Sequence, residues 1–145
     1  MRTKKPTTGK KYFTVAEANA VLPLARSIVR DISELANSLQ ERYDRLTADG
    51  ELDDDNKEEM EQELEQDQEK MREYVQELQK LGIELKDFHT GLIDFPSMMG
   101  KREVYLCWKL GEPDVAHWHE LDAGFAGRRK IRLETAGSST EGSGS

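Results

Sequence analysis

The residues best suited to chemistry lie in one stretch, from Cys107 to Arg128, which holds the only cysteine, both tryptophans and two of the three histidines. His117 and His119 are separated by one residue, so in a β-strand both side chains lie on the same face, about 6 to 7 Å apart. Such a pair can share one zinc or iron ion. The candidates for further ligands are Asp94, Glu112, Asp122 and His89. An open position on the ion would activate water, so this interpretation predicts a metal-dependent hydrolase.

Cys107 and His119 indicate a second kind of chemistry. An imidazole beside a thiol lowers the pKa of the thiol and produces a nucleophile, provided that the two residues meet across neighbouring strands. The alternative for Cys107 is a small, half-buried side chain that only packs. The alternative for His119 is a hydrogen bond to a carboxylate or to a backbone carbonyl beside Trp118. The sequence leaves both alternatives open, and it contains no established catalytic signature.

The loop from Asp122 to Arg128 is the third candidate. Its two glycines let the backbone come close to a ligand or to another part of the chain. We expect Arg128 to pair with Asp94, Glu112 or Asp122 and so to hold the loop on the rest of the fold. Together with the preceding histidine, the loop forms the predicted ligand or partner surface. That surface comprises His119, Asp122, Gly124, Phe125, Gly127 and Arg128.

The elements that position these residues begin with helices. Thr14 and Glu17 form a capping box, which is typical of a helix start. Apolar residues then recur at alternating spacings of three and four residues along two segments, which predicts two heptad-patterned helices. Pro23 is expected to kink the first helix or to split off its first two turns. The acidic segment Thr47–Asn56 reads as the connecting loop, so residues 14–81 are predicted to form an antiparallel helical hairpin.

After Gly82 the pattern changes to alternating apolar and polar residues, which indicates β-strands. In the clearest strand, Trp108 faces one side of the sheet and Cys107 the other. We expect Pro96 to end the second strand, because proline cannot donate a backbone hydrogen bond. The expected strands are residues 83–87, 91–95, 103–110 and 115–121. Together they form a small antiparallel meander that is followed by the glycine-rich loop.

The predicted fold class is therefore α+β, with a long, coiled-coil-like α-helical hairpin followed by a small antiparallel β-meander. We expect a single domain over residues 12–136, with the hairpin at 14–81 and the meander and loop at 83–133. Residues 1–11 are polar and basic, and residues 137–145 are rich in serine and glycine, so both ends are expected to be disordered.

Composition and charge restrict the possible partners. The 145 residues carry a net charge of -8, and residues 49–81 hold fourteen acidic against four basic residues, a net charge of -10. This acidic surface repels phosphate backbones, so nucleic acid is not an expected partner. A hairpin of very roughly 40 to 50 Å, at ~1.5 Å per residue, has little of its own chain to pack on, which favours a homo-oligomer, most simply a dimer. With one cysteine and no signal-like or membrane-spanning run, the chain is expected to be cytoplasmic and free of membranes.

Several motifs resemble a known family, mostly bacterial, catalogued as domain of unknown function 2203. The similarity covers roughly residues 12–131 and is carried by Phe13–Asn19, Gly82–Asp87, Gly91–Pro96, Arg102–Trp108, Gly111–Pro113 and Trp118–Arg128. The resemblance implies the positions of motifs, but no reaction, ligand or cofactor. In the family pattern the position of His117 is more often aromatic, so the resemblance makes His119 the stronger candidate of the pair.

The preferred functional prediction is a non-catalytic, self-associating binding module that requires no cofactor. The ligand or partner would bind around His119 to Arg128. The competing prediction is a zinc- or iron-dependent hydrolase with His119, Asp122 and a carboxylate from Glu112 or Asp94 as ligands.

Overall fold

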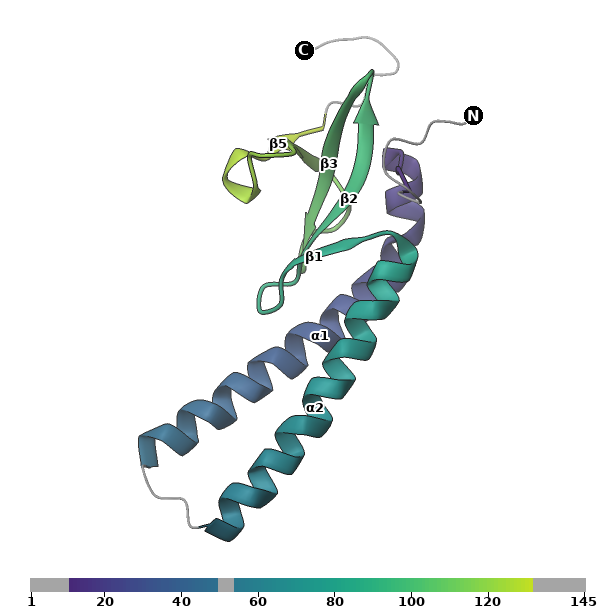
Figure 1. Cartoon of the computed structure of the whole chain (residues 1–145). Coiled ribbons are helices and arrows are strands. Elements are labelled where there is room, and N and C mark those ends of the chain that lie inside the picture. Colours follow the sequence, from purple (N-terminus) through teal and green to yellow (C-terminus); the bar gives the residue numbers. More distant parts are fainter. Residues whose placement is uncertain (1–10, 50–53, 132–145) are drawn as a thin grey trace.

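The computed structural model describes residues 11–49 and 54–131 (Figure 1). Two long helices, α1 (Val15–Asp49) and α2 (Asp54–Leu81), form the predicted hairpin. They extend into both ends of the segment that was predicted to be a loop, and residues 50–53 lie outside the described residues. The termini predicted to be disordered also lie outside them, apart from Lys11.

Local signals in the sequence set the ends of the helices. The amide of Glu17 donates to Oγ1 of Thr14 at 3.0 Å, and the amide of Thr14 donates to Oε1 of Glu17 at 2.9 Å, which confirms the capping box. After α2, Gly82 has a φ of 87°, and its amide donates to the carbonyl of Gln79 at 2.9 Å. The amide of Ile83 donates to the carbonyl of Leu78 at 3.0 Å, which completes a Schellman motif.

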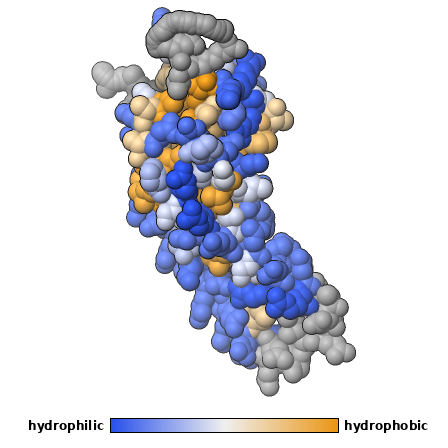
Figure 2. All heavy atoms as spheres, turned by 180° about the vertical axis from the view of Figure 1, so that it is seen from behind, coloured by the Kyte–Doolittle hydropathy of each residue, from blue (hydrophilic) through white to orange (hydrophobic). Residues whose placement is uncertain are grey.

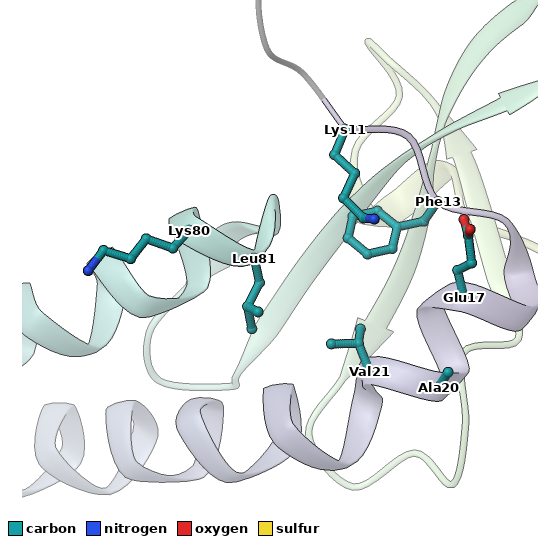
Figure 3. A pocket seen from close by; sticks show the side chains of 7 residues that line it. All are labelled: Lys11, Phe13, Glu17, Ala20, Val21, Lys80 and Leu81. Carbon is teal, nitrogen blue, oxygen red and sulfur yellow. The ribbon is translucent and has the colours of Figure 1, made fainter.

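Pro23 does not split α1, because the helix is continuous through it. The helix changes direction in its first half (Figure 1), close to Val21 (Figure 3). A bend here is expected, since proline removes one hydrogen bond of the helix and its ring crowds the preceding turn.

A five-stranded antiparallel sheet follows the hairpin, and its strands lie side by side in chain order, so the predicted α+β fold with a meander is confirmed. The strands are β1 (Glu84–Asp87), β2 (Leu92–Met99), β3 (Arg102–Lys109), β4 (His117–Glu120) and β5 (Arg129–Lys130). A short 3-10 helix, η1 (Phe125–Gly127), precedes β5. The sequence pattern did not predict β5, because two residues are too few to show alternation.

The prediction that Pro96 ends β2 was wrong. β2 continues to Met99, and Pro96 pairs with Tyr105 of β3. The register of β1 with β2 reaches only to Asp94, which pairs with Glu84, the first residue of β1, so no residue of β1 lies opposite Pro96. Its carbonyl accepts a hydrogen bond from the amide of Phe13 at 2.7 Å. The nitrogen of a strand residue points to the same side as its carbonyl, so the missing amide hydrogen of Pro96 interrupts no bond to β3.

The first half of α1 packs on one face of the sheet and forms the core. The helices contribute Ala18, Leu22, Ala25, Val29, Ile32 and Leu78, and the sheet contributes Ile93, Phe95, Val104, Leu106, Trp108 and Trp118. The second half of the hairpin projects away from the sheet (Figure 1). There two apolar residues of the predicted seam stay exposed, Tyr43 at 63% and Leu64 at 40%. From behind, apolar residues gather over the end with the sheet, whereas the hairpin is mainly hydrophilic (Figure 2).

Candidate ligand-binding site

The face of the sheet opposite α1, called the outer face below, carries the candidate site. Asp94 of β2 pairs with Cys107 of β3, and the next residue but one on β3, Tyr105, pairs with His119 of β4. Paired residues point to the same face, and Trp108 and Trp118, their neighbours in the chain, point to the core. Asp94, Cys107 and His119 are nonetheless no more than 2% exposed. The outer face thus buries three side chains that can titrate or bind a metal.

Both ring nitrogens of His119 have partners. Nδ1 lies 2.7 Å from the carbonyl oxygen of Glu120, which can only accept, so Nδ1 carries a hydrogen. Nε2 lies 3.0 Å from Oδ2 of Asp94. Two bare acceptors do not lie this close in a dry site, so one proton is shared between the imidazole and the carboxyl group. Burial raises the pKa of Asp94, and the neighbouring His119 partly offsets the increase.

One of the two carboxyl oxygens of Asp94 makes no hydrogen bond within the described part of the chain. Its Oδ1 is buried and has no hydrogen-bond partner among the described residues. The thiol of Cys107 lies close enough to this carboxyl group for each to affect the pKa of the other, but no regular hydrogen bond joins the thiol to Oδ1. A buried polar atom without a partner costs about 1 to 3 kcal/mol, so it requires an explanation other than packing.

Cys107 is poorly suited to act as a nucleophile in the metal-free protein. Burial raises the pKa of its thiol to about 12, and the nearby Asp94 adds to the increase because it disfavours a second negative charge. The thiol therefore stays protonated at neutral pH. His119 does not activate it, since its Nε2 is directed at Asp94.

A cavity of about 160 Å³ lies beside the cluster. Asp94, Tyr105 and His119 belong to its lining, together with apolar side chains that include Leu92 and Phe125. The rings of Tyr105 and His119 lie 5.5 Å apart. A polar group next to an apolar wall in a concave site is the usual make-up of a small-molecule site.

Two charged residues, Glu84 and Lys86, extend this polar environment. Oη of Tyr105 donates to the carboxylate of Glu84 at 3.0 Å, and Nζ of Lys86 lies 3.0 Å from the same carboxylate. Burial, followed by the bond to Glu84, raises the pKa of Tyr105 to about 12, so the phenol remains a donor. Lys86 also lines the cavity, where it supplies a cation.

The segment 121–128 covers part of the outer face, on the side of the sheet away from α1 (Figure 1). Arg128 forms an ion pair with Glu112 and donates a hydrogen bond to Nδ1 of His117. The ring of Phe125 lies 4.8 Å from the guanidinium of Arg128 and 5.4 Å from the ammonium of Lys109. These contacts hold the cover in place.

The chain matches, over residues 11–131, the family described as "Uncharacterized conserved protein (DUF2203)". It belongs to this family. No curated protein and no solved structure matches it. Among the described residues, no helix has both the length and the apolar character that crossing a membrane requires.

The structure separates the candidate residues of this family member into two groups. It brings His119, Asp94 and Cys107 together, and their possible ligand atoms all lie within 4.8 Å of one another. His117 lies instead with Glu112 and Arg128. Arg128 is a pure donor, so Nδ1 of His117 accepts, and burial and the guanidinium lower the pKa of this imidazole.

The other candidates lie elsewhere or already have partners. Both carboxylate oxygens of Glu112 accept hydrogen bonds, one from Arg128 and one from the amide of Lys109 at 2.9 Å. Asp122 is exposed. His89 lies in the turn before β2, and its Nδ1 is 2.9 Å from Oδ1 of Asn37 on α1. None of the three is among the residues that come together with His119.

Sequence reasoning missed Tyr105, Glu84 and Lys86 as residues of the site. Tyr105 lies two residues before Cys107 in the predicted strand, so alternation places the two on the same face, and that alternation was the available signal. The contribution of Glu84 and Lys86 depends on the pairing of β1 with β2, where Glu84 lies opposite Asp94.

A larger cleft of about 510 Å³ lies between the start of α1 and the end of α2 (Figure 3). Its charged groups are exposed or already engaged. Nζ of Lys11 lies 5.0 Å from the ring centre of Phe13, and Glu17 caps the helix. The cleft holds no buried titratable side chain among the described residues that line it. The outer face of the sheet is therefore the better candidate for function.

Proposed function

We propose that the protein is a non-catalytic binding module that takes a small ligand on the outer face of its sheet, in the cavity beside Asp94 and His119. The observation that carries this proposal is the buried Asp94 carboxyl group, which shares one proton with His119 and has a second oxygen without a partner. Packing does not require such a group, because the core of the protein lies on the other face of the sheet.

The cavity indicates the chemistry of the ligand. Oδ1 of Asp94 is buried, so a ligand in the cavity reaches it only after a small shift of the side chain. The carboxyl oxygen then accepts a hydrogen bond, so the ligand should carry a donor such as an amide or an alcohol. Leu92 and Phe125 offer apolar surface to the rest of it. At about 160 Å³ the cavity has room for roughly five waters, at about 30 Å³ each, and hence for a small molecule only.

The three histidines allow a direct test by NMR. With histidine labelled in its ring, acetamide should shift the signals of His119. His89, which lies in the turn before β2 and contacts Asn37 of α1, serves as an internal control. Acetate lacks a donor at neutral pH and should have a weaker effect. Phe125→Ala, which removes an apolar wall without touching Asp94, should weaken the binding of acetamide. The proposal fails if acetamide shifts all three histidines alike or none of them.

The exposed half of the hairpin supports a second proposal, self-association. A groove of about 350 Å³ between α1 and α2 is lined by Leu39, Tyr43, Leu64 and Met71 among others. These residues continue the heptad spacing that is buried nearer the sheet, so a second copy has a matching surface. Residues 57–81 of α2 carry a net charge of -5, whereas residues 26–45 of α1 carry equal numbers of acids and bases. Like charges therefore disfavour contacts between two α2 helices, and a dimer should pair α1 with α1.

A further inference from the structure

We propose that Asp94, Cys107 and His119 form a binding site for one transition-metal ion, with zinc the best match. This inference rests on the proposed function in that it adds an ion to the same buried site. It replaces the ligand set predicted from the sequence, because Cys107 takes the place of Asp122 and Glu112.

The arrangement of the three side chains fits a metal. Their ligand atoms lie within 4.8 Å of one another, and Nε2 of His119 is 3.0 Å from Oδ2 of Asp94. A tetrahedral zinc ion, with bonds of about 2.0 to 2.3 Å, holds its ligand atoms roughly 3.3 to 3.6 Å apart. Side-chain shifts that shorten these separations by at most about 1.5 Å therefore convert the observed cluster into a coordination site.

The imidazole of His119 is oriented as a metal ligand requires. In metal sites the second ring nitrogen usually donates to a carboxylate or a backbone carbonyl, which fixes the ring and leaves the first nitrogen free to bind. Here Nδ1 donates to the carbonyl of Glu120 at 2.7 Å. Nε2 consequently faces Asp94 and the ion would replace the proton that the two residues share.

Charge balance favours a divalent ion. A carboxylate and a thiolate together carry two negative charges, so a dication makes the buried site neutral. Binding would displace the proton of the Cys107 thiol and the proton shared by Asp94 and His119. A sulfur ligand favours zinc or iron over magnesium or calcium, which prefer oxygen.

The unpartnered oxygen of Asp94 provides an independent observation. Asp94 is 2% exposed, and its Oδ1 has no hydrogen-bond partner among the described residues. A bound cation would satisfy this carboxyl group, since either oxygen can serve as a ligand. Three protein ligands leave a fourth position, and because Asp94 and His119 line the cavity, a water or a small ligand can occupy that position.

Cobalt(II) offers a test in solution that does not depend on activity. The full chain, purified without a polyhistidine tag and stripped with a chelator, is titrated with Co²⁺ and monitored by absorption. We expect one equivalent to produce tetrahedral d–d bands and a thiolate-to-cobalt charge-transfer band, both of which zinc then abolishes. Loss of a group that only hydrogen-bonds a metal ligand costs about 10- to 100-fold in metal affinity. Cys107→Ser changes a ligand itself, so it should cost at least about 100-fold and remove the charge-transfer band. His117→Gln, the neighbouring histidine outside the cluster, is the matched control and should leave both unchanged.

Two results would overturn the inference. One is a folded wild-type protein, judged by circular dichroism, that gives no charge-transfer band with cobalt. The other is a charge-transfer band that persists in Cys107→Ser. If acetamide still shifts His119 in a protein that shows no such band, the ion is wrong and the ligand site stands. If cobalt gives the charge-transfer band but acetamide does not shift His119, the ion site stands and the proposed ligand site is wrong.

Discussion

Replacement of Asp94 by asparagine separates a functional carboxyl group from a structural one. Asparagine has nearly the same shape, and its Nδ2 can donate to Nε2 of His119 across the 3.0 Å that now separates the carboxyl oxygen from the ring. The bond from Nδ1 to the carbonyl of Glu120 is unaffected. The hydrogen bonds of the imidazole are therefore conserved, and only the capacity of residue 94 to ionise is lost.

The expected effect on stability is small. The Asp94→Asn variant keeps the same number of hydrogen bonds and no longer has to bury a titratable group, so its free energy of unfolding should stay within about 1 kcal/mol of wild type. If the pair with His119 were a structural ion pair, breaking it would cost about 3 to 5 kcal/mol. At about 2 to 4 °C per kcal/mol for a domain of this size, the two cases correspond to a change in Tm of at most about 4 °C or a decrease of about 6 to 20 °C.

Thermal unfolding of the chelated proteins, followed by circular dichroism, measures this difference. Asp94→Ala serves as the comparison, because it removes the hydrogen bond to His119 and leaves a void, and it should cost about 1 to 3 kcal/mol. In the same samples, Asp94→Asn should lose the cobalt spectrum, since a neutral amide is a poor replacement for a carboxylate ligand. A Tm that falls by 6 °C or more at neutral pH, or a cobalt affinity equal to that of wild type, would refute the reasoning.

Three further predictions concern Cys107, Asp87 and the exposed half of the hairpin. Burial raises the pKa of Cys107 to about 12 from an ordinary value of 9.0, which lowers the thiolate fraction about 1000-fold. In the chelated protein, iodoacetamide should therefore label the thiol only after unfolding. Fast labelling of the folded protein would contradict the burial of Cys107. A hydrogen bond from the amide of His89 lowers the pKa of Asp87, so the contribution of Asp87 to stability is present above about pH 3.9 and disappears as the pH falls through the lower value of the folded state. Asp87 is only partly buried, so it should contribute less than about 1 kcal/mol. Asp87→Asn should remove this part of acid unfolding, as measured by urea titrations at each pH. Light scattering should show a dimer at micromolar concentration that strengthens with salt. Tyr43→Glu should convert the dimer to a monomer, whereas Leu24→Glu, also exposed on α1 but outside the groove, should not. A monomeric wild-type protein would end the proposal of self-association.

The parts of the fold that could be read from the sequence are those with local causes. The capping box of Thr14 and Glu17 and the helix end at Gly82 each depend on residues within a few positions of one another. The alternation from Val104 to Trp108 similarly reports which side chains face the core. The prediction at Pro96 failed for a non-local reason, because proline is tolerated in β2 only beyond the position where β1 begins.

The candidate site could be predicted only in part. His119 was selected from the sequence, and its two partners, a carboxylate and a backbone carbonyl, match the alternative that the sequence left open. The choice of Asp94 over Asp122 and Glu112 could not be made, because all three acids are plausible neighbours until the register of the strands is known. Glu112 is engaged by Arg128 and by the amide of Lys109, which only the fold reveals.

The sequence by itself determined the order of the two helices and the first four strands, the two faces of β3 and the residue types available for chemistry, because periodicity and capping act over a few residues. The tertiary structure alone decided that Asp94, Cys107 and His119 meet. They are brought together from three strands by the antiparallel register of β2, β3 and β4, and the cover formed by residues 121–128 lies against the cavity beside them. Burial then raises the pKa of both Asp94 and Cys107, and it does so because desolvation depends on the whole surroundings of a group and not on its neighbours in the chain.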